Sequence, residues 1–263
     1  MPQEVDAAFQ SFTTNYNNFF RMKKMLILFT CLISAQIMLA QDTTRPQRVD
    51  INLAERGSDH LLIQFGMDGW TGAPDSIRTQ GFSRHFNIYF MLDKPFKTNP
   101  RMSVAYGVGI GSSNIFFNRM LVDLKNTGAV LPFRRADSTD HFNKYKLTTV
   151  YAEAPIELRY SSNPNSPSSS FKFALGAKIG TMLKAFTKGK NFQNKNEQTI
   201  YGNKYIVKES EKKFFNSTKL AVTARAGYGI VSVHAGYFVT TLLKENAGPE
   251  IRPWSLGITI SGL

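Results

Sequence analysis

The stretch Met102-Ser-Val-Ala-Tyr-Gly-Val-Gly-Ile-Gly-Ser112 decides the fold, because it alternates strictly between two kinds of residue. Large apolar side chains occupy every second position from Met102 to Ile110, and Ser, Ala or Gly fills the positions between them. Successive side chains of a β-strand point to opposite faces, so this period of two predicts a strand with one apolar face. The glycines belong to the opposite face, where we expect them to make room in a crowded interior. They do not form a nucleotide-binding motif.

The same alternation recurs in seven further segments, which are separated by clusters of Gly, Pro, Asn and Ser. These segments are residues 61–69, 82–92, 148–160, 171–186, 219–228, 231–243 and 254–261. Longer connections alternate with shorter ones, and the two longest are residues 113–142 and the lysine-rich residues 187–217. About eight alternating segments with this spacing predict an all-β fold, a closed antiparallel up-and-down β-barrel. An even strand count would place both ends of the barrel on the periplasmic side.

Residues 1–58 are predicted to precede the barrel domain, which we place at residues 59–263. Two lysines after Met22, an apolar run and a small residue at Ala40 are typical of a secretory signal peptide, here residues 22–40. Residues 1–21 are interpreted as a spurious N-terminal extension and residues 41–58 as a periplasmic linker. An N-terminal membrane anchor is the alternative. The single cysteine, Cys31, lies in the signal, so we expect neither a disulfide framework nor a cysteine-based zinc site.

The average composition resembles that of a soluble basic protein. The 263 residues are 42% hydrophobic and 19% charged, with a formal net charge of +13. Mean hydropathy is -0.23, and no apolar run after residue 40 approaches the roughly 18 residues of a spanning helix. The apolar content suffices for a folded core, which argues against a disordered chain.

Three features of the segments predict that their apolar face meets lipid. Their length of roughly 9–12 residues is what a tilted strand needs to cross a bilayer. Aromatic residues mark the ends of several apolar faces, as in interfacial girdles: Phe82, Tyr160, Phe171, Tyr228 and Trp254. The opposite face is rich in Gly, Ser and Thr. We therefore predict a transmembrane barrel in the outer membrane of a Gram-negative cell, with a soluble lipocalin-like ligand-binding barrel as an alternative.

Several charged residues share the parity of the small, polar face. They are Glu153, Glu157, Arg159, Lys172, Lys178, Lys184, Lys219 and Arg225, and His234 joins them. With about eight strands the interior is just wide enough for side chains to fill it. A charge in such a narrow, low-dielectric space is costly unless it is paired. We predict a lumen polar network in which carboxylates and cations pair across neighbouring strands, and no open pore.

No catalytic or metal-binding motif is present. The histidines His60, His85, His141 and His234 have no metal-ligand spacing, so we predict no cofactor, no metal and no enzymatic activity. An outer-membrane lipid-modifying enzyme remains the alternative, because such sites assemble in space with little sequence signature. The lysines of residues 187–217 could contact lipopolysaccharide phosphates, or they could simply be solvated. Membrane lipid, lipopolysaccharide and other envelope or secretion proteins are the predicted partners, and nucleic acid is not.

The run Tyr151-Ala-Glu-Ala-Pro-Ile-Glu-Leu-Arg-Tyr160 resembles the Tyr-x-Glu-hydrophobic-Pro-x-x-Leu-Lys-Tyr signature of PorT-like outer-membrane β-barrel proteins. The segment from Phe171 to Gly180 resembles that family's next strand. The resemblance implies an integral outer-membrane barrel, and one branch of the family is linked to protein secretion and assembly machinery. It predicts a non-enzymatic structural or secretion-associated role, with long extracellular loops as the interaction surface.

Overall fold

The computed structural model describes residues 60–80, 82–136 and 140–262. The predicted N-terminal extension, signal peptide and linker lie outside the described residues. Within the described part no helix is long and apolar enough to cross a membrane.

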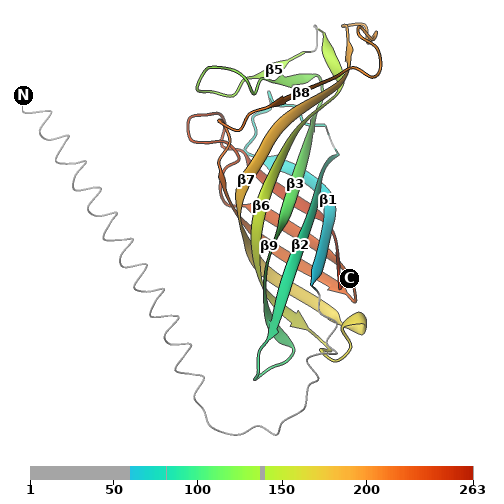
Figure 1. The fold of residues 1–263 in the computed structure, drawn as a ribbon, viewed down its shortest axis with the longest axis vertical. Helices are drawn as coiled ribbons and strands as arrows, with labels where there is room; N and C mark the ends of the chain where they lie inside the picture. Colours follow the sequence, from blue (N-terminus) through green and yellow to red (C-terminus); the bar gives the residue numbers. More distant parts are fainter. Residues whose placement is uncertain (1–59, 81, 137–139, 263) are drawn as a thin grey trace, which may run out of the picture. The chain divides into compact units, whose positions relative to one another are not determined.

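The described chain is built of β-strands (Figure 1). The strands are β1 (Leu61–Thr71), β2 (Ser83–Pro95), β3 (Met102–Phe117), β4 (Met120–Val122), β5 (Phe133–Arg135), β6 (His141–Ser161), β7 (Phe171–Gln193), β8 (Ile206–Ser210), β9 (Thr218–Tyr228), β10 (Val231–Phe238) and β11 (Arg252–Ser261). One 3-10 turn, η1 (Pro167–Ser169), precedes β7.

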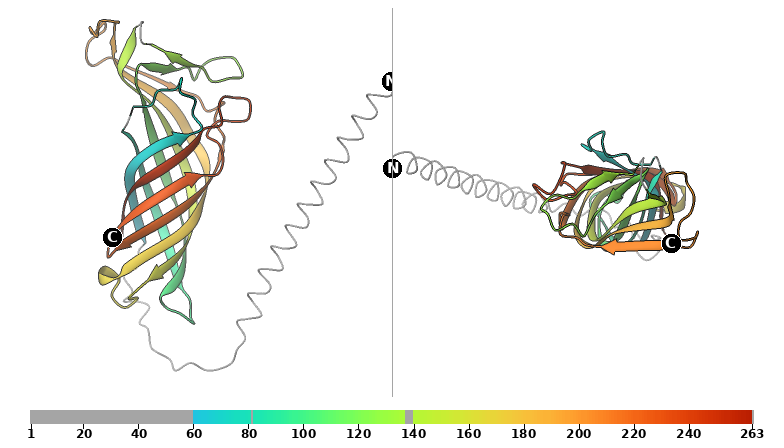
Figure 2. Two further views of the ribbon diagram at one scale, coloured as in Figure 1. Left: turned by 180° about the vertical axis from the view of Figure 1, so that it is seen from behind. Right: turned by 90° about the horizontal axis from the view of Figure 1, so that it is seen from above.

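The main sheet closes on itself, as the end-on view of Figure 2 shows. Its order is β6-β3-β2-β1-β11-β10-β9-β7-β8, and β6 also pairs with β7. Eight of these nine strands therefore form a ring, and β8 extends the sheet by pairing with the far part of β7. Every ring strand lies antiparallel to both of its neighbours in the ring, and β11 closes onto β1. This confirms the predicted closed, antiparallel, up-and-down β-barrel.

The two ends of the barrel differ. The long connections β1–β2, β3–β6, β7–β9 and β10–β11 gather at one end, here named the loop end, together with β4, β5 and β8 (Figures 1 and 2). The short connections β2–β3, β6–β7 and β9–β10 lie at the opposite turn end. Residues 113–142 and 187–217, expected to be loops, are partly strand: the first range holds the end of β3, β4, β5 and the start of β6, and the second holds the end of β7 and β8. These strands continue past the ring at the loop end.

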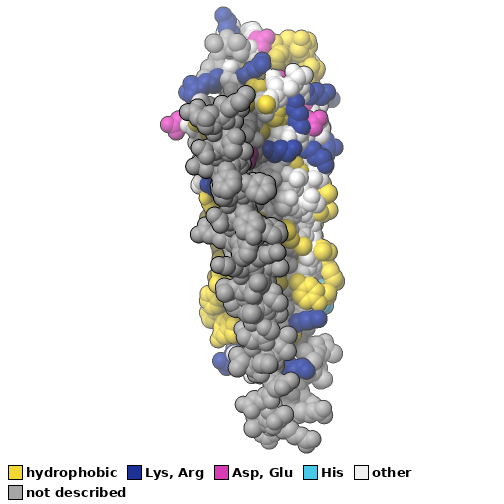
Figure 3. All heavy atoms as spheres, turned by 90° about the vertical axis from the view of Figure 1, so that its left-hand side faces the viewer, with side chains coloured by type: hydrophobic (Ala, Val, Ile, Leu, Met, Phe, Trp, Pro, Cys, Tyr) yellow, Lys and Arg dark blue, Asp and Glu magenta, His cyan; other side chains and the backbone are white. Residues whose placement is uncertain are grey.

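Over most of its height the barrel is apolar outside and polar inside. Leu175 is 67% exposed on the outer surface, whereas Lys178 on the same strand is 7% exposed and Glu153 on β6 is 4% exposed. On the face shown in Figure 3, apolar side chains lie on the barrel wall, and most Lys and Arg side chains lie toward the loop end. An apolar outer belt around a polar interior is the organisation of a transmembrane β-barrel. The belt runs on β6 from about Val150 to Tyr160.

The alternation inverts beyond this belt. On the loop-end part of β6, Tyr145 and Leu147 point inward and are buried, whereas Lys144 and Lys146 point outward. The change coincides with a bulge between Val150 and Tyr151 of β6, opposite one extra residue on β7. The extra residue reverses the inward parity of β7 alone, whereas on β6 Tyr145 and Leu147 keep the inward parity of Glu153. On β6 it is the residue types at the inward and outward positions that change, so this strand presents a polar outer face and an apolar inner face at the loop end.

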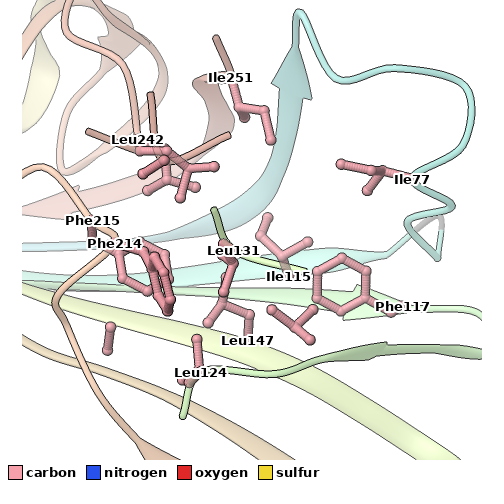
Figure 4. Packing of buried hydrophobic residues seen from close by; sticks show 14 of the residues in the cluster. Ile77, Ile115, Phe117, Leu124, Leu131, Leu147, Phe214, Phe215, Leu242 and Ile251 are labelled. Atoms are coloured by element: carbon pink, nitrogen blue, oxygen red, sulfur yellow. The ribbon is translucent and has the colours of Figure 1, made fainter. Parts of the chain in front are cut away.

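The inward apolar side chains at the loop end form a core that closes the barrel (Figure 4). Its members come from the strand ends and the long connections, and they include Ile77, Ile115, Phe117, Leu124, Leu131, Leu147, Phe214, Phe215, Leu242 and Ile251. The Tyr145 hydroxyl donates to the Val122 carbonyl at 2.8 Å and fixes β4 against β6. The long connections are therefore packed into one cap.

Candidate functional site: the polar interior of the barrel

Glycines on β7 determine which side chains meet inside the barrel. Gly180 stands in register between Glu153 on β6 and Lys219 on β9. A Cβ at Gly180 would lie 3.1 Å from Glu153 Cγ, and one at Gly176 would lie 3.0 Å from Glu157 Cγ. Because these positions lack side chains, the two carboxylates reach over β7 to cations of β9.

The first group of buried charges surrounds Glu153. Lys219 Nζ donates to Glu153 Oε1 at 2.6 Å, and the Tyr89 hydroxyl donates to Glu153 Oε2 at 2.6 Å. Lys178 Nζ donates to the Tyr89 hydroxyl at 2.9 Å and to Gln64 Oε1 at 3.0 Å. Tyr89 is 1% exposed. Each oxygen of the Glu153 carboxylate thus has a charged or strongly polar donor.

The second group surrounds Glu157, nearer the turn end. Arg225 Nη2 and Arg159 Nε donate to Glu157 Oε2 at 3.0 Å and 2.9 Å. Arg159 Nη1 also lies 3.7 Å from Asp93 Oδ1, an ion-pair distance, and the Ser103 hydroxyl donates to the same oxygen at 2.7 Å. Glu157 and Asp93 balance the charges of Arg159 and Arg225.

A chain of hydrogen bonds starts at Asp68 on β1. Asp68 Oδ1 lies 2.7 Å from His85 Nδ1, and His85 Nε2 lies 2.9 Å from His234 Nε2. His234 Nδ1 lies 2.9 Å from the Thr259 hydroxyl, to which Gln64 Nε2 donates at 3.1 Å. Since Gln64 also accepts from Lys178, the chain joins Asp68 to the Glu153 group.

One placement of protons satisfies the whole chain. His85 donates from Nδ1 to Asp68 and accepts at Nε2 from His234, and His234 accepts at Nδ1 from Thr259. Both imidazoles are then neutral, and Asp68 and Glu153 balance Lys178 and Lys219. In this arrangement the charges of the interior cancel, as a low-dielectric site requires.

The same contacts limit what the histidines can do chemically. A Ser–His–Asp nucleophile requires the serine hydroxyl to bond the imidazole. Here the Ser113 hydroxyl donates to Asp68 instead, and both ring nitrogens of His85 are occupied by Asp68 and His234. Both histidines are therefore held by hydrogen bonds within the network.

The interior leaves little free space. A cavity of about 30 Å³ beside Asp68, His85 and Glu153 has room for water-sized molecules only. Within the described ranges, no three His, Cys, Asp or Glu side chains are placed to hold a metal ion.

The structure places most residues of the predicted network inside the barrel. Glu153, Glu157, Arg159, Lys178, Lys219, Arg225 and His234 are buried. Lys172 is half-buried at the first residues of β7 and has an interaction partner. The prediction is wrong for Lys184, which is exposed on the outer surface, because the extra β7 residue at the bulge reverses the parity. The observed pairs join the fourth and sixth predicted segments, because Glu153 and Glu157 of β6 reach the cations of β9 across β7.

Several members of the network were missed. Gln64, Asp68, Tyr89, Asp93 and Thr259 all contribute polar atoms to it. All but Asp93 lie within predicted segments and carry the inward parity, which was the signal available for finding them. His60 lies elsewhere, with Nδ1 3.0 Å from the Met91 carbonyl oxygen.

Comparison with protein families and with curated protein sequences gives no match. Among solved structures, similar ones are two crystal structures of Ail, the attachment invasion locus protein of Yersinia pestis, the second in complex with the heparin analogue sucrose octasulfate. Each has 14% sequence identity and a TM-score of 0.31, and covers 76% of this chain and 95% of Ail. Likeness at this level carries no inference about ligand or activity.

Proposed function

We propose that this chain is an integral outer-membrane β-barrel protein without enzymatic activity, with a structural or secretion-associated role and extracellular long connections. The observation that carries the proposal is the inside-out barrel: an exposed apolar belt, and an interior in which the charges are paired. A closed ring leaves no unpaired strand edge in the hydrocarbon. In water this belt would expose large apolar side chains around the whole wall, which is unfavourable for a soluble barrel.

The orientation of the barrel in the membrane is inferred from the lengths of the connections at its two ends. In outer-membrane barrels the short turns lie on the periplasmic side and the longer connections outside. Here the long connections form the apolar cap at the loop end, and we place that end at the cell exterior.

Fractionation and gel migration test this proposal. The protein is expected in the outer-membrane fraction, and its unboiled form should migrate differently from the boiled form because a closed barrel resists detergent. Recovery in the soluble periplasm, without a heat-dependent change in mobility, would refute it.

The connection β7–β8 supports a role in interactions. Beyond the ring, Ile200, Tyr201, Tyr205 and Ile206 are exposed, at 41%, 64%, 38% and 49%. Tyr201 stacks on Phe192 at 6.1 Å between ring centroids and contacts Tyr205 at 4.9 Å. Exposed, mutually packed aromatic residues are frequent at protein interfaces.

If the chain is related to PorT-like proteins, the partner that binds the β7–β8 connection would be a component of a secretion or assembly machine. The motif between Tyr151 and Tyr160 supports this relationship. A photo-crosslinking residue at Tyr201 should then capture an envelope protein that the same residue at Asn163, in the turn-end connection, does not. Identical captured species at both positions would argue against a partner at the β7–β8 connection.

A further inference from the structure

The outer wall beyond the apolar belt carries a cluster of cations on strands β2, β6, β7 and β8. Its members are Arg84, Lys144, Lys146, Lys188, Lys190 and Lys208. Five of them, all except Lys208, line one pocket of about 280 Å³ together with Phe116. We name these six residues the cationic wall.

Lysines of the cationic wall face one another directly across the sheet. Lys144 is paired in register with Lys190, and Lys146 with Lys188. Lys188 is also paired with Lys208 on its other side. Side chains in directly opposed positions lie about 5 Å apart at Cβ, and like charges there are destabilising. Three such contacts in one patch are unfavourable unless a counter-charge balances them.

In the ranges that the structure describes, no carboxylate lies within ion-pair distance of the cationic wall; the carboxylates in ion pairs bond other cations. Lys146 Nζ donates to Asn114 Oδ1 at 2.6 Å, which leaves it further donors. Partial burial and the charges of Lys188 and Arg84 lower the pKa of Lys146 from its usual value. A bound anion would relieve this crowding.

The position of the cationic wall indicates the kind of anion. Directly below it, toward the turn end, the same outer face becomes the apolar belt, with Phe86 at 50%, Ile110 at 55% and Leu183 at 49% exposed. Two aromatic rings lie among the cations. Arg84 Cζ is 5.7 Å from the Phe116 centroid, and Lys208 Nζ is 4.2 Å from that of Phe186. Cations and aromatic rings at the edge of a hydrocarbon belt match the headgroup level of a bilayer.

We propose that the cationic wall is a binding site for the phosphate groups of an outer-leaflet glycolipid of the lipid A type, whose acyl chains lie along the belt below. The proposal rests on the proposed function, since it needs the barrel in a membrane with the loop end outside. It also divides the lysines of residues 187–217. Lys188, Lys190 and Lys208 belong to the site, whereas Lys195, Lys204 and Lys212 are exposed in the connections.

The test compares two variants with the same loss of charge. The pocket variant is Lys144→Gln, Lys146→Gln, Lys188→Gln and Lys190→Gln. The control variant is Lys195→Gln, Lys204→Gln, Lys212→Gln and Lys244→Gln, at exposed positions of the same end. The full chain of each, in a zwitterionic detergent, is titrated with phosphorylated lipid A and with its dephosphorylated form, and binding is followed by native mass spectrometry.

We expect the pocket variant to bind phosphorylated lipid A about tenfold more weakly or worse, since each lysine near anionic lipid contributes to binding. The control variant should stay within about twofold of wild type. Without lipid, the pocket variant should unfold no more readily than wild type, because it loses like-charge pairs. A heat-dependent mobility shift in every protein shows that the barrel is intact.

Equal binding by both variants, or equal binding of the dephosphorylated lipid to wild type, would overturn the proposal. Wall-dependent binding of soluble heparin, with no binding of lipid A, would also overturn it, in favour of a polysaccharide. Wild type without a heat-dependent mobility shift would instead contradict the proposed function, so the two failures are distinguishable.

Discussion

The two halves of the barrel interior are filled with opposite kinds of side chain. At the level of the apolar belt, charges such as Glu153 and Lys219 pair inside the barrel, over β7. At the loop end, Leu147 and Phe117 pack in a core of the ordinary apolar kind. Both halves use the same strands, and both use strict alternation. The difference is which residue types take the inward positions: polar ones at the level of the belt and apolar ones at the loop end.

This comparison shows that interior polarity is set from outside. Side chains alternate between the two faces of a strand, so a strand whose outer face is apolar toward lipid can carry its polar residues on the inner face. Once the strand leaves the membrane, its outer face must be polar, and its inner face is free to form a core. The change of residue types on β6, near Val150, therefore marks the loop-end edge of the belt.

The largest expected effect comes from removing a buried charge of the belt-level half. Glu157→Ala leaves Arg225 and Arg159 without their shared carboxylate, and breaking a buried pair in this way costs about 3–5 kcal/mol. Urea unfolding in detergent measures the loss. Glu250→Ala removes the carboxylate of a surface ion pair, and it should cost less than about 1 kcal/mol. Equally small effects of the two changes would show that the lumen charges are not coupled.

The loop-end half should respond to loss of volume. Leu147→Ala truncates a 1% exposed side chain, and a buried leucine truncated to alanine costs about 2–5 kcal/mol. Limited proteolysis should show the connections cut faster while the barrel keeps its heat-dependent mobility. Leu175→Ala makes the same chemical change on the lipid-facing wall, where the side chain is 67% exposed. If both leucines behaved alike, the cap would not be an independent core.

A smaller effect is expected from one neutral member of the lumen network. Tyr89→Phe keeps the ring and removes the hydroxyl that accepts from Lys178 and donates to Glu153. Glu153 retains Lys219, so we expect a loss of about 1–2 kcal/mol in urea unfolding. Tyr237→Phe, on a half-exposed outer side chain, is the matched control and should be close to neutral. A Tyr89→Phe protein as stable as wild type would mean that the hydroxyl bridge is dispensable.

Much of this architecture could be predicted from the residues alone. Alternation over the segment from Met102 to Ser112 and its counterparts predicted the ring, because strand parity is a local property. The same parity identified the buried charges, Glu153 and Arg225 among them. Their partners were harder to identify, because pairing across β7 depends on Gly176 and Gly180 and on the register of three strands.

The loop end could not be predicted in the same way. A bulge adds one residue on one strand and carries no strong local signal, so Lys184 was assigned to the wrong face. Residues 113–142 contain short strands whose apolar side chains find partners only in distant connections, such as Phe214 and Leu242. Packing between remote segments is not encoded in any one window of sequence.

The smallest expected effect concerns the outer wall at the loop end. Burial and the neighbouring cations lower the pKa of Lys146, so folding disfavours its charged form. That penalty is fully present below the folded-state pKa and fades as the pH rises through it toward the ordinary value of about 10.4.

In lipid-free detergent at neutral pH, Lys146→Gln should therefore stabilise the protein by a few tenths of a kcal/mol, and about 1 kcal/mol at most. The gain should shrink as the pH approaches about 10, as measured by urea unfolding at both pH values. Lys204→Gln, at an exposed position, should show neither the gain nor its pH dependence. Destabilisation by Lys146→Gln at neutral pH would mean that the lysine is held by favourable contacts, and that the outer wall is not a strained array of like charges.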